Sequence, residues 1–318
     1  MARVLARRVR RLVITLFVVT FLSALMLSLL PGDPALQVAS ADYNITADQL
    51  DEVRHELGLD RPIPQRYAKW MGEALQGDLG HSFRTREPVT VAIRSRLPVT
   101  LELMLVAQFM ALGFALLIAP VSAYTRGSWF DRGSTTVSFG LLSLPNFILG
   151  LLLIYLFAVK FHVFPATGFR PLSDGLGPNL RSIVLPAATL AAAEAAVYAR
   201  LLRAEMISTL QEDFVLVAHA KGLPRWRILL QHALRPSSLP LVTIVGLNVG
   251  RLIGGAVIVE TLFTLPGIGR LAVDSILGRD FVMVQGIVAM VTVAYVLVNF
   301  LIDLLYYALD PRIRHAAA

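Results

Sequence analysis

The run LELMLVAQFMALGFALLIAPVSAY, from Leu101 to Tyr124, decides the fold class of this chain. A helix of about 20 apolar residues, rising about 1.5 Å per residue, crosses the roughly 30 Å hydrocarbon core of a bilayer. The run is long enough to do this, and Glu102 near its start is its only charged residue. The run therefore predicts a transmembrane helix.

Five further runs of similar length and character predict five more transmembrane helices. The chain has 318 residues, of which 56% are hydrophobic and 16% charged, a composition outside the range of soluble domains. The runs are continuous in Leu, Val, Ile and Ala, whereas the strands of a membrane barrel alternate over about ten residues. The sequence thus predicts an all-α, polytopic membrane protein with six transmembrane helices. The five runs are Leu12–Leu30, Thr135–Phe161, Ile183–Ile207, Ser237–Phe263 and Phe281–Leu309.

The positions of the cationic residues predict the topology. Five arginines and no acid precede the first run, which places the N-terminus in the cytoplasm by the positive-inside rule. This run is longer than the apolar part of a signal peptide and no A-x-A site precedes Pro31, so residues 1–30 are interpreted as a cytoplasmic N-terminus and a retained first helix. With six spans, the tail at residues 310–318 is cytoplasmic too. The cytoplasmic cations are Arg3, Arg7, Arg8, Arg10, Arg11, Arg126, Arg132, Arg200, Arg203, Lys221, Arg225, Arg227, Arg235, Arg312 and Arg314.

The remaining residues divide into an external segment and a membrane core. Residues 31–98 predict an extracytoplasmic inserted domain, because loops beyond about 60 residues translocate largely regardless of charge. Thr46 and Gln49 form a capping box for a helix over residues 47–57, and Pro64–Leu75 predicts a second helix. Residues 99–309 predict a five-helix core, with a cytoplasmic loop at residues 210–236.

No catalytic motif occurs in the sequence. It lacks the phosphate-binding G-x-x-x-x-G-K-[ST] pattern and the H-E-x-x-H and G-x-S-x-G patterns of hydrolases. There is no cysteine, and the 6 histidines fall on both sides of the membrane without metal-ligand spacing. The sequence therefore predicts no catalytic residue, no bound cofactor and no metal site. Transport, sensing and scaffolding remain as function classes.

The stretch DFVLVAHAKGLPRWRILLQHALRPSSLP, starting at Asp213, predicts an elbow of two helices in the cytoplasmic loop. Asp213 is a good N-cap for a first helix that ends at Lys221. Gly222 suits the left-handed position that ends a helix, with Leu223 folding back toward Ala218. The sequence thus predicts a fixed turn between the two helices.

The second helix of the elbow, over residues 225–234, is predicted to be amphipathic. Pro224 opens it at the first helical position, where the missing N–H costs nothing. One interpretation is an interfacial helix whose basic residues meet anionic headgroups; the other is a knob that enters a groove on another protein. The apolar side is predicted to carry Trp226, Leu229, Leu230 and Ala233, and the other side Arg225, Arg227, Gln231, His232 and Arg235.

Short motifs occur in a characteristic order along nearly the whole chain. They are PGDPA (31–35), LGLDRP (57–62), GDLG (77–80), RLPVTLEL (96–103), LPNF (144–147), PATG (165–168), AHAKGL (218–223), HALR (232–235) with Pro240, GGAVIVE (254–260), FTLPGIGR (263–270) and LDPR (309–312). In order and spacing they resemble the integral membrane subunit of dipeptide/oligopeptide/nickel-type ABC importers. This resemblance implies an ABC importer type I-like permease fold.

The resemblance also implies partners and roles. The elbow would be the coupling helix that docks on a cytoplasmic ATPase, although Leu216 and Val217 stand where the general family pattern has a glutamate. The implied partners are a second homologous permease, two cytoplasmic ABC ATPases that carry the ATP and Mg, and an extracytoplasmic substrate-binding protein. No nucleic acid is implied. The implied coupling residues are Asp213, Ala218, Ala220, Lys221, Gly222, Leu223, Pro224, Arg225, Trp226 and Arg227.

Two further groups of residues are assigned through the same resemblance. The external loop after the fifth run would contact the binding protein or form a gate, through Pro266, Gly267, Gly269 and Arg270. The implied process is import of dipeptides, oligopeptides or a related small solute by alternating access, across the cell (inner) membrane of a bacterium or archaeon. The candidates for the translocation path are Pro145, Asn146, Asn248 and Arg251.

Arg251 lies near the middle of the fifth run, where a charge costs about 2.5–3.5 kcal/mol unless it faces protein or water. It either forms a structural pair with an acid such as Glu194 or lines the path and attracts a carboxylate of the cargo. The glycines of the same run either pack helices or serve as hinges. They are Gly246, Gly250, Gly254 and Gly255.

Two other kinds of membrane protein remain as alternatives. A secondary transporter would need coupling-ion ligands and internal repeats, which the sequence does not display. A sensor or scaffold without ATPase partners would explain the external domain but not the elbow. The importer subunit accounts for both.

Overall fold

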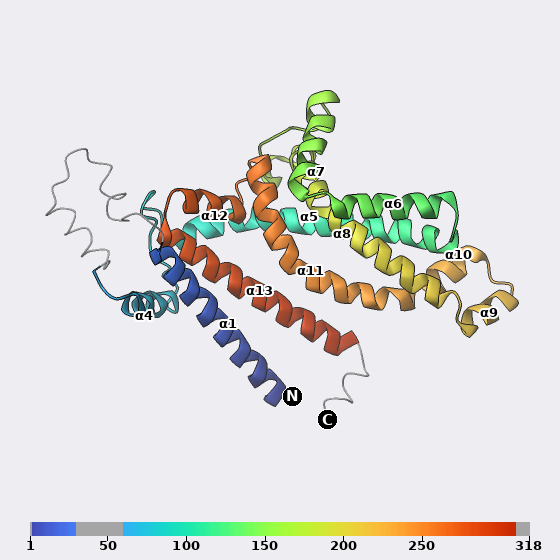
Figure 1. Cartoon of the computed structure of the whole chain (residues 1–318), viewed down its shortest axis with the longest axis horizontal. Helices are drawn as coiled ribbons and strands as arrows, with labels where there is room; N and C mark the ends of the chain where they lie inside the picture. The colour runs from blue at the N-terminus through green and yellow to red at the C-terminus, as the bar shows by residue number, and fades with distance from the viewer. Residues whose placement is uncertain (1, 30–59, 310–318) are drawn as a thin grey trace. The chain divides into compact units, whose positions relative to one another are not determined.

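The computed structural model describes residues 2–29 and 60–309 (Figure 1). The predicted helix over residues 47–57, its capping box, the motif at residues 31–35 and the tail at residues 310–318 lie outside these ranges. The described part is helical, with turns and an isolated β-bridge between His81 and Pro88. The prediction of an all-α chain is therefore confirmed for the described residues.

The helices follow one another as labelled in Figure 1. Their bounds are α1 (Ala2–Leu29), α4 (Ile63–Ala74), α5 (Val89–Tyr124), α6 (Trp129–Ser143), α7 (Asn146–Leu153), α8 (Leu176–Thr209), α9 (Asp213–Ala220), α10 (Arg225–Arg227), α11 (Leu234–Phe263), α12 (Ile268–Leu277) and α13 (Phe281–Leu309). Two π-helical segments, η1 (Ile154–Lys160) and η3 (Ile228–Ala233), and a 3₁₀ turn, η2 (Leu172–Asp174), complete the path.

The described residues contain 4 helices long and apolar enough to cross a membrane, or 5 if the bent pair of α6 and α7 with η1 is one span. Helix α1 contains a shorter apolar stretch, Val13–Leu25. The polytopic membrane fold is thus confirmed, whereas the count of six and the orientation of the termini stay predictions. The four long helices are Val89–Tyr124, Leu176–Thr209, Arg225–Phe263 and Phe281–Ile302.

The third predicted span is not one straight helix. Helices α6 and α7 meet at an angle of 110° across a short break. Leu144 has an extended backbone at the break (φ −88°, ψ 125°), and Pro145 follows it directly. Proline disfavours a helical conformation at the residue before it, which explains why α6 stops at Ser143. The prediction of a single helix over Thr135–Phe161 is therefore wrong.

Several helices extend beyond the predicted runs. Helix α5 begins at Val89, well before Leu101, so the predicted boundary between residues 31–98 and the core falls inside a helix. The path from Arg225 to Phe263 is likewise continuous, where a separate helix and span were predicted. Hydropathy locates only the apolar part of a helix, since the polar turns outside the hydrocarbon carry no such signal.

The chain forms two compact units. One comprises residues 1–98 with Arg270–Leu301, and the other Val99–Gly269 with residues 302–318. We call them unit one and unit two and describe each by itself.

In unit one, helix α4 confirms the helix predicted at Pro64–Leu75. Its apolar side packs on α1 through Tyr67, whose side chain is buried. The Tyr67 hydroxyl lies 2.8 Å from Oγ1 of Thr20. The rings of Phe17 and Phe21 meet the Tyr67 ring edge-on, at 5.7 and 5.2 Å between centroids.

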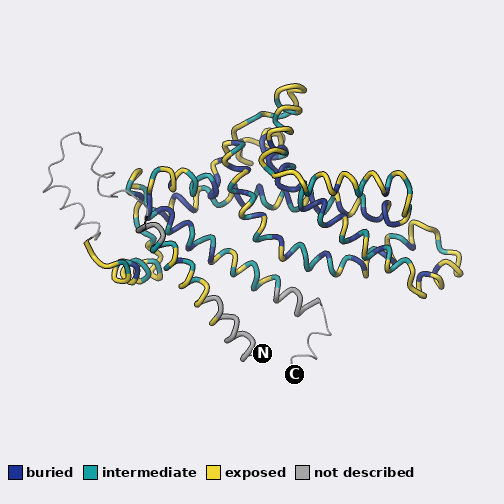
Figure 2. Tube along the Cα trace, in the orientation of Figure 1, coloured by how far each residue is buried: buried dark blue, intermediate teal, exposed yellow. Residues whose placement is uncertain are grey.

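In unit two, α8 is the central helix. Its apolar window is 72% buried, compared with 28% for α5 and for Arg225–Phe263 (Figure 2). Alanines at intervals of four line the core side of both α5 and α8, and such small residues allow helix backbones to approach closely. These alanines are Ala107, Ala111, Ala115, Ala119 and Ala123 in α5, and Ala187, Ala191, Ala195 and Ala199 in α8.

Candidate functional site

The predicted elbow joins α8 to α11 and contains the predicted turn. Gly222 has a left-handed backbone, with φ +73°. Its N–H donates to the carbonyl of His219 at 3.0 Å, and the N–H of Leu223 donates to the carbonyl of Ala218 at 3.3 Å. This pair of bonds is the Schellman motif, which ends a helix with a left-handed residue. The predictions for Gly222 and for the folding back of Leu223 are confirmed.

Both predicted helix starts are displaced by one residue. Glu212 holds the N-cap position of α9, without a hydrogen bond from its side chain, and Asp213 is the first helical residue. Pro224 is the N-cap of the second helix, with ψ 144°, so Arg225 is the first helical residue there. The carbonyls of Glu212 and Pro224 each accept the first helical hydrogen bonds, as an N-cap residue does.

The elbow has a small core of its own. Val215 and Ala218 of α9 and Ile228 of η3 are at most 5% exposed and pack together. Leu210 and Leu223 close this core from the two ends of α9. The two arms of the elbow are therefore fixed to each other by buried apolar contacts as well as by the turn.

The predicted apolar side of the second helix is wrong in part. Trp226 and Leu230 are exposed, at 62% and 49%, whereas Ile228 and Ala233 are buried. The cause is the π-helical segment η3, in which hydrogen bonds run from i to i+5 rather than i to i+4. The wider turn of this segment shifts side-chain directions away from those that a period of 3.6 predicts.

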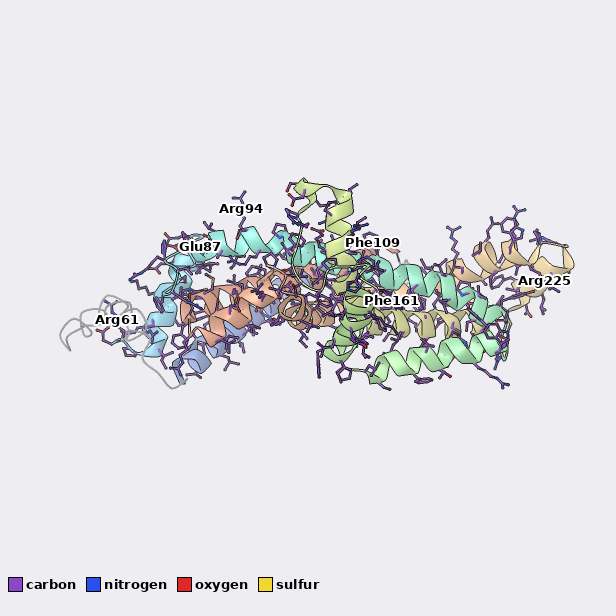
Figure 3. All side chains as sticks on the ribbon, turned by 90° about the horizontal axis from the view of Figure 1, so that it is seen from above. Arg61, Glu87, Arg94, Phe109, Phe161 and Arg225 are labelled. Carbon is purple, nitrogen blue, oxygen red and sulfur yellow. The ribbon has the colours of Figure 1, made fainter. Side chains whose placement is uncertain are left out.

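The outer surface of the elbow combines exposed apolar and cationic side chains. Lys221, Arg225 and Arg227 are exposed, and Arg225 lies at the tip (Figure 3). Large apolar side chains exposed beside such cations are typical of surfaces that contact another protein or a membrane. Sequence reasoning missed most of them, although their helical positions opposite Val215 and Ala218 carry the signal. They are Phe214, Leu216, Val217, Trp226 and Leu230.

The predicted coupling residues fall into three groups. Ala218 is 5% exposed and belongs to the core of the elbow, so it is not available to a partner in this conformation. Gly222 and the partly buried Leu223 build the turn. The others are exposed: Asp213, Ala220, Lys221, Pro224, Arg225, Trp226 and Arg227.

A buried polar layer crosses unit two between α5, α8 and α11. Glu194 of α8 has a side chain only 6% exposed, and it accepts a hydrogen bond from Nδ2 of Asn248 at 2.5 Å. Its other carboxylate oxygen lies 3.7 Å from Nε of Arg251. One turn further along α8, the buried hydroxyl of Tyr198 lies 3.2 Å from Nε2 of Gln108. Polar groups buried in a membrane helix bundle are expected to pair in this way.

The structure pairs Arg251 with Glu194, as the interpretation of a structural ion pair predicts. Its side chain is nevertheless 58% exposed, so the ion pair with Glu194 leaves much of the guanidinium uncovered. Its role in a translocation path stays a prediction.

The other two path candidates lie at the break between α6 and α7. Pro145 is exposed in the bend, and Asn146 begins α7. Asn146 lies against α11, because a Cβ added at Gly255 would be 3.5 Å from its Nδ2. Gly255 is one helical turn beyond Arg251. Three of the four candidates, Asn146, Asn248 and Arg251, therefore lie on or beside the same stretch of α11.

Sequence models of a known family match both parts of the chain. The family described as binding-protein-dependent transport system inner membrane component matches residues 111–315. The N-terminal region of such membrane components matches residues 1–104. The chain belongs to this family. The permease is accordingly a multi-pass protein of the inner membrane.

Curated relatives align with the permease over nearly its whole length. The di/tripeptide transport system permease protein DppB of Pseudomonas aeruginosa is 41% identical over 331 residues, covering 98% of each chain. The glutathione transport system permease protein GsiC of Escherichia coli O6:H1 is 38% identical over 309 residues, covering 97% of the permease and 98% of the relative.

In the permease, the turn after α11 is built around the carboxylate of Glu260, which is fully buried. Oγ1 of Thr100 donates to this carboxylate at 2.6 Å and accepts from the N–H of Ile268 at 2.8 Å. A Cβ on Gly267 would overlap the carboxylate, and one on Gly269 would lie 2.5 Å from the backbone of Val257. Glycine at these two positions is thus required for the turn to close on Glu260.

The four residues predicted to contact the binding protein or form a gate differ in their burial. Gly267 and Gly269 are buried, and the close approach to α11 requires glycine at both positions; their role in a gate or partner contact stays a prediction. Pro266 is exposed. Arg270 is partly exposed and lies 3.6 Å, Nε to Oδ2, from Asp274 one turn along α12.

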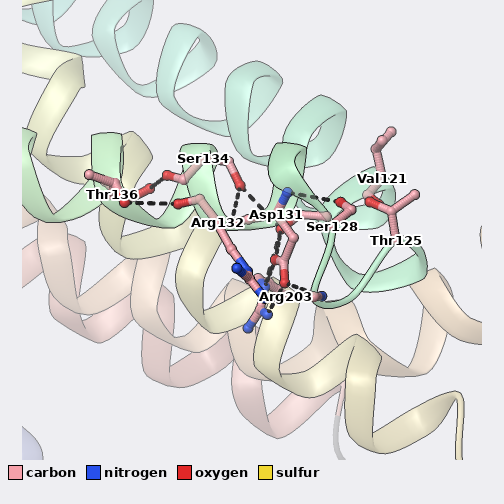
Figure 4. Close-up of polar contacts among 11 residues, drawn as sticks. Val121, Thr125, Ser128, Asp131, Arg132, Ser134, Thr136 and Arg203 are labelled. Carbon is pink, nitrogen blue, oxygen red and sulfur yellow. Dashed lines mark hydrogen bonds and ion pairs between the residues drawn. The ribbon is translucent and has the colours of Figure 1, made fainter.

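The permease also contains a buried ion pair that sequence reasoning missed (Figure 4). Asp131, in the first turn of α6, binds Arg203 of α8 through both oxygens, at 2.5 and 2.8 Å. Its carboxylate also accepts from Oγ of Ser122 at 2.6 Å and from the N–H of Gly127 at 2.9 Å. Arg203, predicted only as one of many cytoplasmic cations, therefore fixes α6 to α8.

Two glycines of α11 allow a neighbouring side chain to approach the helix closely. A Cβ on Gly246 would lie 2.6 Å from Ile302, and one on Gly255 would lie 2.6 Å from Leu190. Gly254 has no neighbour within 4 Å of an added Cβ. A hinge role for this residue stays a prediction.

Proposed function

We propose that the permease is the transmembrane subunit of an ATP-driven, binding-protein-dependent importer of peptides or a related small solute. The observation that carries this proposal is the full-length similarity to permeases named for di/tripeptide and for glutathione transport, at 41% and 38% identity. We infer that it provides half of the translocation path. A second, homologous permease provides the other half.

In this proposal the permease has six spans, with both termini in the cytoplasm. Helix α1 is the sixth span, and its basic start supports a cytoplasmic N-terminus. The cations of the elbow support the same orientation for the loop between α8 and α11. The surface around Pro266 and the segment at residues 31–98 then face the binding protein.

The elbow is the docking site for a cytoplasmic ABC ATPase. Two such ATPases bind ATP and Mg, and hydrolysis is theirs rather than that of the permease. The core of the elbow and the hydrogen bond between Oγ1 of Thr209 and Oγ of Ser237, at 2.9 Å, join it to α8 and α11. The ion pair between Asp131 and Arg203 joins α6 to the same group of helices. A displacement of the ATPase would therefore move these helices together, as a rigid body, to alternate access.

The path lies along the exposed face of α11 that carries Arg251, with Asn146 and the buried Asn248 beside it and Pro145 at the bend that precedes α7. The polar layer at Glu194 supports this location, because ionisable groups within membrane helices face protein or a water-filled cavity.

Purification and reconstitution test this function. The permease, isolated from its native membrane in mild detergent, should bring two ATPases and a second permease. Together with the binding protein in proteoliposomes, this assembly should take up labelled di- and tripeptides only when ATP is present. Uptake by the isolated permease without ATP would make it a secondary transporter instead.

A further inference from the structure

We propose that Arg251 is the receptor for a carboxylate of the transported solute, and that it binds this carboxylate in place of its contact with Glu194. This inference rests on the proposed transport function and names the chemical group that the path recognises. Every peptide with a free C-terminus carries such a carboxylate, whatever its sequence. A single arginine in the path could therefore serve many peptides.

The first argument is the surface on which Arg251 lies. Positions i, i+4, i+7 and i+11 share one face of a helix, and on α11 these are Leu247, Arg251, Gly254 and Ile258. All four are exposed, with Leu247 at 59% and Ile258 at 45%. Arg251 is the charged member of this apolar face. Its position near the middle of a membrane helix requires that the face meets water or protein rather than lipid.

The second argument is the incomplete contact with Glu194. The ion pair is formed by Nε at 3.7 Å, which is longer than a charge-assisted hydrogen bond of about 2.7–2.9 Å. Within residues 2–29 and 60–309 this is the one ion pair of the guanidinium. The two terminal nitrogens therefore remain for a bidentate contact with an incoming carboxylate, which is the geometry that a guanidinium prefers.

The third argument is that Glu194 has a second partner besides Arg251. Its other carboxylate oxygen accepts a 2.5 Å hydrogen bond from Asn248. Arg251 can thus leave without stranding a wholly unpaired buried carboxylate. Glu194 in turn competes with the bound solute for the guanidinium. Such competition suits a transport path, where binding must be favourable enough to enter and weak enough to leave.

The fourth argument is the space beside the guanidinium. Gly254 lies one turn from Arg251 on the same face, and an added Cβ there has no neighbour within 4 Å. A small ligand can approach the arginine over this glycine, while a larger side chain would occupy the approach.

The chain has no cysteine, so a Gly254→Cys variant carries a single thiol beside Arg251. In the assembled complex, we expect this thiol to react with a membrane-impermeant, water-soluble thiosulfonate, followed by mass spectrometry of this chain. Dialanine should slow the reaction at a concentration about tenfold lower than dialanine amide, which lacks the carboxylate. A tenfold difference in protecting concentration corresponds to about 1.4 kcal/mol of binding free energy.

Two further substitutions in the Gly254→Cys background test the exchange. Arg251→Gln should raise the protecting concentration of dialanine at least tenfold and remove the difference from the amide. Glu194→Gln should lower that concentration, because the competing charge is gone. A purely structural role for the pair would not shift protection in opposite directions. Arg181→Gln, at an exposed arginine of α8, and Gly113→Cys, at an open glycine of α5, are the matched controls.

Three outcomes would overturn the proposal. Equal protection by dialanine and its amide would remove the carboxylate from the recognition. Reaction only with a lipophilic maleimide would place this face in lipid. A thiol that reacts in the isolated permease but not in the assembled complex would place Arg251 in the interface with the second permease. In each case ATP-driven peptide uptake by the wild-type complex would still stand, so the proposed function would survive.

Discussion

At the scale of single residues, three buried carboxylates of the described part of unit two have defined partners. Glu260 is held by Thr100, Asp131 by Arg203, and Glu194 by Asn248. Burying a carboxylate is costly unless hydrogen bonds or an opposite charge compensate. These contacts are the ones that a single substitution can test.

Gly267→Ala should destabilise the permease. The new methyl group would overlap the carboxylate of Glu260, which is buried and held by Thr100 and so cannot easily move. Overpacking of this kind costs about 1–3 kcal/mol. The measurement is the apparent midpoint of thermal unfolding of the purified complex. Gly133→Ala is the matched control, because its added Cβ has no neighbour within 4 Å. Equal midpoints for the two variants would contradict the account of the turn.

Asp131→Asn should also destabilise the permease, because Arg203 loses its charged partner while its side chain remains only 26% exposed. We expect a loss of about 1–3 kcal/mol, the typical cost of removing one partner of a buried hydrogen bond. The double variant Asp131→Asn/Arg203→Gln should lose less than the sum of the single variants. Unfolding by denaturant of all four proteins measures this coupling. Strict additivity would show that the pair does not join α6 to α8.

At the scale of elements, the two arms of the elbow are joined to each other by a turn and a small shared core. The turn is closed by Gly222, and the core is formed by Val215, Ala218 and Ile228. The apolar side chains left outside this core are therefore free to contact a partner.

Trp226→Ala should weaken binding of the ATPase to the permease. Exposed tryptophans at interfaces are frequent hot spots, whose loss costs about 2 kcal/mol or more, or about thirtyfold in affinity. Titration of purified ATPase against the permease in nanodiscs measures this affinity. The control is Trp129→Ala, since Trp129 is 85% exposed but lies at the start of α6, outside the elbow. If both variants bind as the wild type does, the exposed face of the second helix is not the docking surface.

The sequence was sufficient to predict those elements that depend on composition or on one residue type. Apolar runs predicted the membrane helices, and Gly222 predicted the turn of the elbow because a left-handed position favours glycine. The π-helical segment at Ile228–Ala233 was not predictable, because it changes the helical period without a marker residue. The 110° break was signalled by Pro145, but proline also occurs inside α5, α8 and α11 without ending them.

The candidate site was predictable in the same uneven way. Arg251 and Glu194 were identified because a charge in an apolar run requires a partner. Asp131 was missed because it lies outside the predicted run and its partner is 72 residues away in sequence. Whether Gly267 contacts a partner or accommodates Glu260 depends on a fold in three dimensions that spacing alone does not give.

At the scale of the whole molecule, the central claim is that the elbow transmits the action of ATP to the membrane helices. Helix α8 connects the elbow to the polar layer at Glu194, and α11 returns from the elbow to Arg251. A rigid turn between the two arms is essential to this claim. Proline cannot adopt the backbone of Gly222, whose φ is +73°, and it lacks the N–H that donates to His219.

The measurement that tests this claim most directly is ATP-driven uptake of a labelled dipeptide by proteoliposomes that contain the permease, its ATPases, the second permease and the binding protein. We predict ATP-dependent uptake for the wild type. The Gly222→Pro complex, still assembled and still hydrolysing ATP, should show uptake reduced at least tenfold. Uptake by this variant equal to that of the wild type would contradict the claim, because the membrane helices would then be moved by some other contact.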